Sequence, residues 1–459
     1  MRSVWPVSNS NWHDNAKDLT LESFKLRDVF SRGMPTVTYV RRDQLGLEDE
    51  LRRSLERGNA IIAITGPSKC GKTVLRKHVI PDENVVQVEG GQIDDEAGFW
   101  DTLRNHLDIP TSESESANSQ NSQGAGFEVG LGTRNLGVRA NLNVSEQAVT
   151  GGIRNYTGAQ KGHILKILRM SDCALIIDDF HYIKRTVRAN IIRSLKSAVF
   201  EGLTVVLLSM PYRAFDVLTA EVEMEGRFTH ISLDPWDEGD LRKIAEQGFP
   251  AMGMLVANET VYHLAREALG SPLLMQALCA ELCQKYNVSS ASEITIEVSD
   301  AAVDYPDLCR RIARDFGLPQ FEKLAAGPQS RRDRITRIFI NGNEGDIYDA
   351  VLAAIACSGA DDKISYDKLR TSLRAVLLDA IPQKHEVTRS IVHMCEIARG
   401  MHLASVRQRE GDAPDDGIDV PALEWKDEIL YINDIFLRFY LRWIHRPTFD
   451  SPNANFEQA

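Results

Sequence analysis

Two glycines, a lysine and a threonine follow a short apolar run at fixed spacing in the stretch IIAITGPSKCGKT. They satisfy the pattern G-x-x-x-x-G-K-[ST]. Glycines let the backbone curl so that successive N–H groups point inward and bind phosphate oxygens, and a following helix adds its positive end. The stretch therefore predicts a phosphate-binding loop. The residues expected to line it are Gly66, Pro67, Ser68, Lys69, Cys70, Gly71, Lys72 and Thr73.

Two of these side chains have separate expected roles. Lys72 would reach the β- and γ-phosphates of a nucleotide, and the Thr73 hydroxyl would ligate Mg²⁺. Cys70 lies beside Lys69 and Lys72 near a helix N-terminus, a setting that favours the thiolate. We nevertheless expect Cys70 to be incidental to catalysis.

A magnesium-nucleotide site also needs a carboxylate at the end of a neighbouring strand, and the segment CALIIDDFHYI supplies two. Asp178 would hold Mg²⁺ through water, and Asp179 would polarise the attacking water. Ser209 closes the next apolar segment, VVLLSM, where its hydroxyl could bond the γ-phosphate or the water. Serines also end strands without a catalytic role, so both interpretations of Ser209 stay open.

Short apolar segments that alternate with helical patterns must position these residues, as in a parallel sheet wrapped by helices. Their β-branched content and short length predict strands buried on both faces. The fold expected is an α/β P-loop NTPase sheet. The segments are 61–65, 85–88, 174–178, 203–209 and 230–233, preceded by a helix expected over 42–57.

An insert over 111–150 interrupts the nucleotide-binding domain. Residues 111–125 are polar and of low complexity, which predicts a flexible loop. Period-two alternation on both sides of residues 132–135 predicts a β-hairpin. The hairpin could cover the sheet or lid, pair edge to edge with hairpins of other subunits, or, least expected, line a membrane pore.

Changes in the spacing of apolar residues divide the chain into further segments. Residues 345–447 predict three helices followed by a β-ribbon, the order of a winged helix. The expected domains are an N-terminal extension (1–34), a P-loop nucleotide-binding domain (35–236), a helical lid (237–300), a helical linker (301–344), a winged-helix-like domain (345–447) and a disordered tail (448–459).

Composition narrows the function classes. A net charge of -12 over 459 residues disfavours the whole surface as a nucleic-acid platform. The seven cysteines form no CxxC pair, which argues against a disulfide frame and a structural zinc site. Because no apolar run reaches the roughly 18 to 20 residues that span a bilayer, we expect a cytoplasmic protein without a membrane segment.

Taken together, these motifs resemble the AAA+ and STAND branches of phosphate-loop ATPases over about residues 35–290. The phosphate loop, LIIDDF, the strand ending at Ser209, GRFTHISLDPW and LGSPLLMQALC occur in the order seen there. The C-terminal part is similar to the winged helix that ends archaeal-type STAND ATPases and replication initiators. The resemblance implies ATP and Mg²⁺ as cofactors.

The resemblance also implies two further site residues. Arg227, in the Gly226-Arg227-Phe228 segment, matches the position of an arginine finger that completes a neighbouring subunit's site. Pro272, in Gly270-Ser271-Pro272, matches the lid motif whose proline packs on the nucleotide, although ordinary helix capping predicts much the same residues.

Two departures from that pattern point toward slow hydrolysis. AAA+ motors usually carry Asp-Glu where this chain has Asp178-Asp179, and a base placed about 1 Å too far can cost ~100-fold in rate. The lid also lacks an evident second-sensor arginine. We therefore expect switching more than turnover.

The sequence is compatible with three functions. The first is an ATP-controlled switch that forms a homo-oligomer through the nucleotide-binding domain and acts with a separate effector protein in bacterial antiviral defence or stress signalling. The second is an AAA+ ATPase that assists DNA replication, transposition or repair; nucleic acid is possible but not favoured, because the expected wing, GDAPDDG, is acidic. The third is a nucleotide-stabilised scaffold without productive hydrolysis. The second would use a basic track of Arg310, Arg311, Arg314, Arg331, Arg332, Arg334 and Arg337.

Overall fold

The structure is a computed structural model, and its description covers residues 24–109, 128–130, 137–139, 158–171, 173–210, 227–292, 294–329, 333–407 and 422–444. The described residues form two compact units, residues 41–235 and residues 24–40 together with 236–444. The polar segment 111–125, the acidic stretch 411–417 and the tail 448–459 lie outside the described residues.

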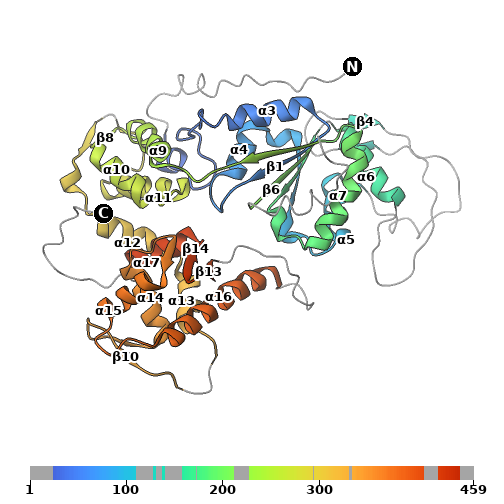
Figure 1. The fold of residues 1–459 in the computed structure, drawn as a ribbon. Coiled ribbons are helices and arrows are strands. Elements are labelled where there is room, and N and C mark those ends of the chain that lie inside the picture. Colours follow the sequence, from blue (N-terminus) through green and yellow to red (C-terminus); the bar gives the residue numbers. More distant parts are fainter. Residues whose placement is uncertain are drawn as a thin grey trace, which may run out of the picture. The chain divides into compact units, whose positions relative to one another are not determined.

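A five-stranded parallel sheet forms the first unit, in the order β2-β5-β6-β1-β7 (Figure 1). Strands β1, β5 and β6 are buried along their whole length, as their apolar sequences predict. Each of the five predicted segments contributes one strand, which confirms the α/β P-loop NTPase fold. The strands are β1 (Ile61–Thr65), β2 (Val85–Glu89), β5 (Ala174–Asp178), β6 (Val205–Ser209) and β7 (Phe228–Ser232).

Helices cover both faces of this sheet (Figure 1). On one face, α3 and α4 pack Leu51, Leu55 and Leu75 against strand residues such as Ile62 and Ile64. On the other, α5, α6 and α7 contribute a larger apolar cluster. The helices are α3 (Leu47–Arg57), α4 (Lys72–Val79), α5 (Glu96–His106), α6 (Gly158–Met170) and α7 (Arg185–Phe200), with short 3-10 helices η2 (Asp82–Asn84), η3 (Gly90–Gln92) and η5 (Phe180–Tyr182).

One local feature of this unit corrects the sequence prediction, and another confirms it. Helix α3 begins at Leu47 and not at Arg42, because Gly46 adopts a left-handed φ of 57° that cannot continue a helix. The insert contains β3 (Glu128–Gly130) and β4 (Gly137–Arg139), which pair antiparallel with Val129 opposite Val138. The predicted hairpin is therefore present.

The second unit begins with a helical part that has its own core. Helices α9, α10, α11 and α12 pack together, and they are joined by Val29 of the short helix α2 and by Phe30, which follows it. The ring centroids of Phe30 and Phe249 lie 5.4 Å apart. The elements are α2 (Leu26–Val29), α9 (Glu238–Ala251), β8 (Met254–Val256), α10 (Asn258–Glu267), α11 (Pro272–Lys285), β9 (Ile296–Val298), η7 (Asp300–Ala302) and α12 (Tyr305–Asp315).

The rest of the second unit combines helices with a small antiparallel sheet of order β12-β14-β13. Strand β12 pairs with β14 and was not predicted from the sequence. The aromatic helix α17 joins two cores, because Phe439 lies in the helical core while Leu437 and Leu441 lie in the C-terminal one. The elements are α13 (Leu318–Ala326), β10 (Arg337–Ile338), β11 (Glu344–Gly345), α14 (Ile347–Cys357), β12 (Lys363–Ser365), α15 (Tyr366–Val376), α16 (Lys384–Arg407), β13 (Leu423–Lys426), β14 (Ile429–Ile432) and α17 (Ile435–Trp443).

Candidate nucleotide-binding site

The carboxyl ends of β1, β5, β6 and β2 meet at one edge of the parallel sheet (Figure 1). The predicted phosphate loop follows β1, the acid pair ends β5, and Ser209 ends β6. Open α/β sheets bind ligands at this edge. The fold thus brings together the residues that the sequence singled out in this unit, with the exception of Arg227.

The backbone of the loop requires both of its glycines. Gly71 has φ 100°, a conformation that side chains rarely adopt, and it stands directly before α4. A Cβ on Gly66 would lie 2.7 Å from both the Cys70 sulfur and the carbonyl oxygen of Leu233. The first glycine therefore allows close packing, and the second allows the chain to turn into the helix.

Lys72, the first residue of α4, folds its side chain back over the loop. Its Nζ donates hydrogen bonds to the carbonyl oxygens of Gly66 at 2.9 Å and Pro67 at 2.8 Å. The ammonium group is thus held at the loop, where phosphate oxygens would compete with these carbonyls for its hydrogens. This position suits the role predicted for Lys72.

Thr73 and Asp178 face each other across the site. The Thr73 hydroxyl donates to the Asp178 carboxylate at 3.1 Å. Within the described ranges, no group of three or more His, Cys, Asp or Glu side chains could hold a metal ion by itself. Mg²⁺ commonly takes one or two protein oxygens and completes its shell with phosphate and water. A hydroxyl paired with one buried carboxylate fits that mode.

Asp179 leaves the strand in a left-handed conformation, with φ 51° and ψ 39°. Its backbone N–H donates to the Asp178 carboxylate at 2.8 Å. Burial raises the pKa of Asp179 above its usual range, and the neighbouring charge of Asp178 adds to the effect. Asp179 therefore lies beside the expected metal position, and its role as the base stays a prediction.

Ser209 is fully buried, and among the described residues its hydroxyl has no hydrogen-bond partner. Its carbonyl oxygen accepts a hydrogen bond from the N–H of Gly66 at 3.3 Å, so the residue touches the start of the loop. A buried hydroxyl without a partner is costly unless a ligand or water completes it. This observation is consistent with a ligand at the site and leaves the predicted contact to the γ-phosphate untested.

Arg227 lies at the opposite edge of the sheet. Its carbonyl accepts from Ile61 at the amino end of β1, whereas the loop follows the carboxyl end, about 15 Å further along a five-residue strand. The guanidinium stacks on Phe200, 4.4 Å from the ring centroid. Arg227 therefore does not serve its own loop across this sheet, and a role in a neighbour's site stays a prediction.

Pro272 belongs to the second unit, where it is the first residue of α11. Ser271 caps that helix, and its hydroxyl accepts from the N–H of Leu274 at 3.3 Å. Helix capping thus accounts for the Ser-Pro pair locally. The predicted contact of Pro272 with a nucleotide remains a prediction.

The expectation of a thiolate at Cys70 is wrong. Cys70 is buried, and this burial raises the pKa of its thiol, outweighing the charge of Lys72, which acts in the opposite direction. The sulfur fills space against Gly66. Cys70 is a packing residue of the loop in its neutral form.

Sequence reasoning missed a carboxylate and a glycine at the end of β2. Glu89 pairs in register with Asp178, and a Cβ on Gly90 would clash with the backbone of Asp179. The signal was present in the stretch VVQVEGG, because the carboxyl ends of parallel strands meet at one edge. Its apolar run is short and alternating, so the acid after it resembled a solvated strand end.

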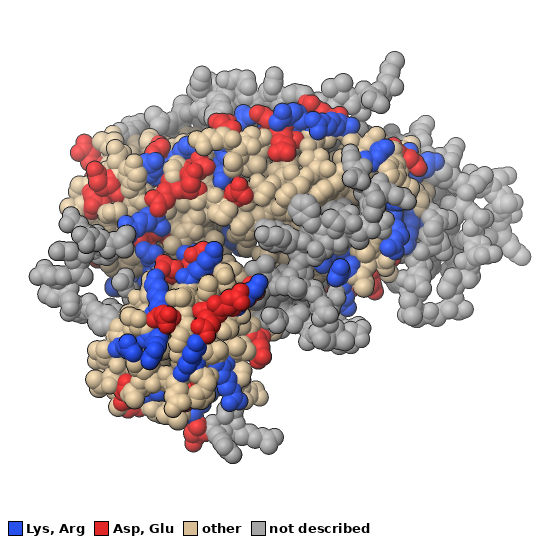
Figure 2. Space-filling view, in the orientation of Figure 1, with Lys and Arg blue, Asp and Glu red and all other residues tan. Residues whose placement is uncertain are grey.

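The proposed basic track in the second unit is partly neutralised. Arg311 pairs with Asp307 at 3.1 Å, Arg334 with Asp346 at 2.5 Å, and Arg337 with Glu386 at 3.7 Å. Arg331 and Arg332 lie outside the described residues. Figure 2 shows basic and acidic side chains interspersed over the visible C-terminal helices. These pairs reduce the charge available to bind phosphates of nucleic acid.

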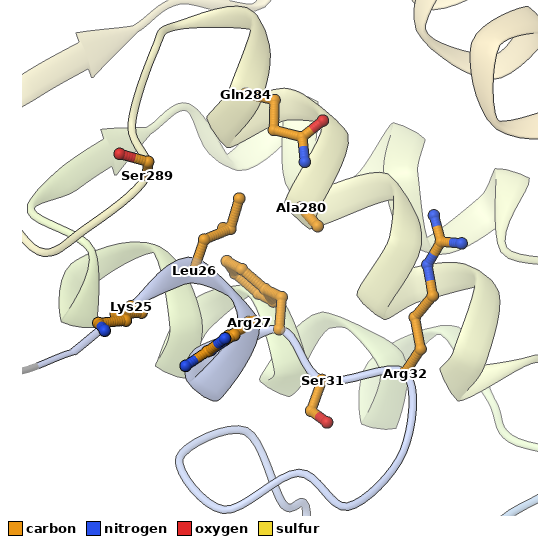
Figure 3. Close-up of a pocket in the computed structure, with 9 residues that line it drawn as sticks. Lys25, Leu26, Arg27, Ser31, Arg32, Ala280, Gln284 and Ser289 are labelled. Carbon is orange, nitrogen blue, oxygen red and sulfur yellow. The ribbon is translucent and has the colours of Figure 1, made fainter.

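A hollow of about 610 Å³ lies in the second unit between α2 and α11 (Figure 3). The Leu26 side chain points from α2 toward Ala280 and Gln284 on α11. Arg32, at its rim, already bonds Asp315 at 3.3 Å and stacks on Phe316. Polar and basic side chains such as Lys25 and Arg27 line the hollow beside the apolar ones, and the hollow brings together no catalytic set.

Comparison with known proteins returned only distant structural likeness. No protein-family description and no curated protein matches the chain. A Walker-type ATPase of Pyrococcus abyssi is 12% identical, with 88% of this chain and 99% of that chain covered and a TM-score of 0.45. The ORC2 protein of Aeropyrum pernix is 14% identical, with 91% and 97% covered and a TM-score of 0.44.

A STAND protein with a tetratricopeptide repeat sensor from Pyrococcus horikoshii is also similar, at 13% identity and a TM-score of 0.33, with 88% of this chain and 42% of that chain covered. These values are too low to argue for a shared function. The fold assignment therefore rests on the sheet order and the loop. Among the described helices, none has the length and apolarity of a membrane span.

Proposed function

We propose that the chain is an ATP-binding, slowly hydrolysing ATPase that works as an oligomeric switch. The observation that carries the proposal is the Thr73 hydroxyl at 3.1 Å from the Asp178 carboxylate, beside a lysine held at the phosphate loop. These residues would hold a magnesium-bound triphosphate through backbone N–H groups, one ammonium and one buried carboxylate.

The chemistry of the site would be hydrolysis of the γ-phosphate. Mg²⁺, when bound through Thr73 and Asp178, would neutralise phosphate charge. Lys72 would turn from the loop carbonyls to the β- and γ-phosphates, and a nearby carboxylate would orient water for attack. The hydroxyl of Ser209, buried and without a partner among the described residues, would bond the γ-phosphate or that water.

The place of Arg227 supports the proposal that the chain assembles through its nucleotide-binding unit. Because this arginine lies at the far edge of its own sheet, it would reach a phosphate only in a neighbouring subunit. ATP would then favour the assembled state to the extent that it binds that state more tightly. Hydrolysis would release it.

The finer proposal is a role in bacterial defence or stress signalling with a separate effector protein, in the cytoplasm. Its support is the resemblance to STAND ATPases in the order of the motifs. None of the seven cysteines, all of which lie among the described residues, forms a disulfide, which accords with a reducing compartment. Assistance to DNA replication, transposition or repair gains no support from the paired arginines of the second unit.

Light scattering and single-turnover hydrolysis test the proposal together. Purified protein should gain mass when Mg-ATP is added and should cleave bound ATP slowly. Lys72→Ala should do neither, because the ammonium at the loop is lost. The switch would be refuted if, in Mg-ATP, the wild type neither gained mass nor cleaved ATP.

A further inference from the structure

A third carboxylate, Glu89, stands at the end of β2 beside the acid pair. Glu89 and Asp178 are register partners on adjacent parallel strands, so their side chains project to the same side of the sheet. The bond from Thr73 shows that Asp178 faces α4. Glu89 therefore faces the helix that follows the phosphate loop.

A chain of hydrogen bonds that starts at the buried Arg76 fixes the position of Glu89. The Gln87 amide donates to one Glu89 carboxylate oxygen at 2.5 Å and accepts in turn from Arg76. Arg76 is fully buried on α4 and also bonds Asp82 at 2.5 Å. Since α4 begins at Lys72, the carboxylate of Glu89 is tied to the element that carries the loop.

One oxygen of Glu89 remains available. Among the described residues, the amide of Gln87 is its one hydrogen-bond donor. The Glu89 side chain is half-buried, so it is neither solvated freely nor sealed in the core. A carboxylate anchored through one oxygen can bind water with the other.

Asp179 differs from Glu89 in side-chain length and in backbone conformation. Its side chain is one methylene shorter than that of Glu89. Its backbone turns out of the strand at φ 51° and packs its carbonyl against Gly90. Glu89 combines the longer side chain with a position that Gln87 and Arg76 fix.

We propose that Glu89, and not Asp179, is the residue that orients the attacking water and accepts its proton. This inference rests on the ATPase function proposed above. The water oxygen bonds to the γ-phosphorus as its proton passes to the Glu89 carboxylate. The bond from the γ-phosphorus to the bridging oxygen breaks, and its electron pair stays on ADP. The proton then leaves Glu89 with phosphate or solvent.

Single-turnover cleavage of ATP, measured beside Mg-ATP affinity on the full chain, tests the assignment. Glu89→Gln keeps the bond from Gln87 but cannot take a proton, so cleavage should slow by ~100-fold or more while Kd stays within about twofold. Asp179→Asn should slow cleavage by less than about tenfold. Glu83→Gln, an exposed acid on η2, is the matched control and should match the wild type.

Glu89→Asp separates catalysis from support. Shortening the side chain should slow cleavage by about 10- to 100-fold without changing Kd or the melting temperature, because the water is displaced while the fold remains. Equal rates for Glu89→Gln and wild type would overturn the assignment and leave the ATPase function standing. So would a loss confined to Asp179→Asn. Absence of ATP binding by the wild type would overturn the ATPase function itself.

Discussion

Gly90→Ala tests the close approach of β2 to the acid pair. The added Cβ would lie closer than 3 Å to the carbonyl oxygen of Asp179 and 2.9 Å from its carbonyl carbon, which are backbone atoms. Overpacking of this kind costs about 1–3 kcal/mol. Loss of glycine freedom in the unfolded chain offsets ~0.4–1 kcal/mol. We expect a net loss of about 1–2 kcal/mol.

Gly91→Ala is a control one residue away. Its Cβ would meet its nearest atom, on Tyr182, at 4.0 Å, so only the stabilising effect on the unfolded chain remains. For a unit of roughly 200 residues, about 2–4 °C per kcal/mol predicts that Gly90→Ala melts about 2–8 °C below wild type. Scanning calorimetry measures both variants. Equal melting of Gly90→Ala and Gly91→Ala would refute the predicted contact.

Two further predictions concern the edges of the sheet. Arg227→Ala should bind Mg-ATP normally but hydrolyse it more slowly. Mixing it with Lys72→Ala should restore turnover at sites formed between the two variants. If turnover is not restored, Arg227 is not an arginine finger. Burial lowers the pKa of His230, which lies 2.7 Å from Thr65, below its ordinary 6.5. Below about pH 6.5 the unfolded chain therefore binds a proton at this histidine more readily than the native state does. The free energy of unfolding should then fall as the pH drops, by at most ~1.4 kcal/mol per pH unit. His230→Gln should flatten that slope in urea titrations.

The phosphate loop and the five strands could be predicted because their signals are local. Gly66, Gly71 and Lys72 stand at a spacing set by the backbone itself, and the segments from 61–65 to 230–233 are short apolar runs. The ends of a strand are harder to predict than its existence, as β7 shows, because it begins at Phe228 and not at His230. Its exposed and half-buried residues blur the boundary.

Contacts between distant segments could not be read from the chain. The hydrogen bonds from Arg76 through Gln87 to Glu89 join α4 to β2, and no hydrophobic pattern or sequence motif predicts them. The charge of Cys70 was misjudged for a related reason. Its neighbours in sequence are lysines, whereas its pKa is set by burial that only the packed loop reveals.

The most direct test of the central claim is titration calorimetry with Mg-ATP. Wild type should give a saturable heat, and Lys77→Ala, which changes an exposed lysine of the same helix, should do the same. Lys72→Ala should give none, because its ammonium at the loop carbonyls is the group that would reach the phosphates. A heat for Lys72→Ala equal to that of wild type, or no heat for wild type, would contradict the account.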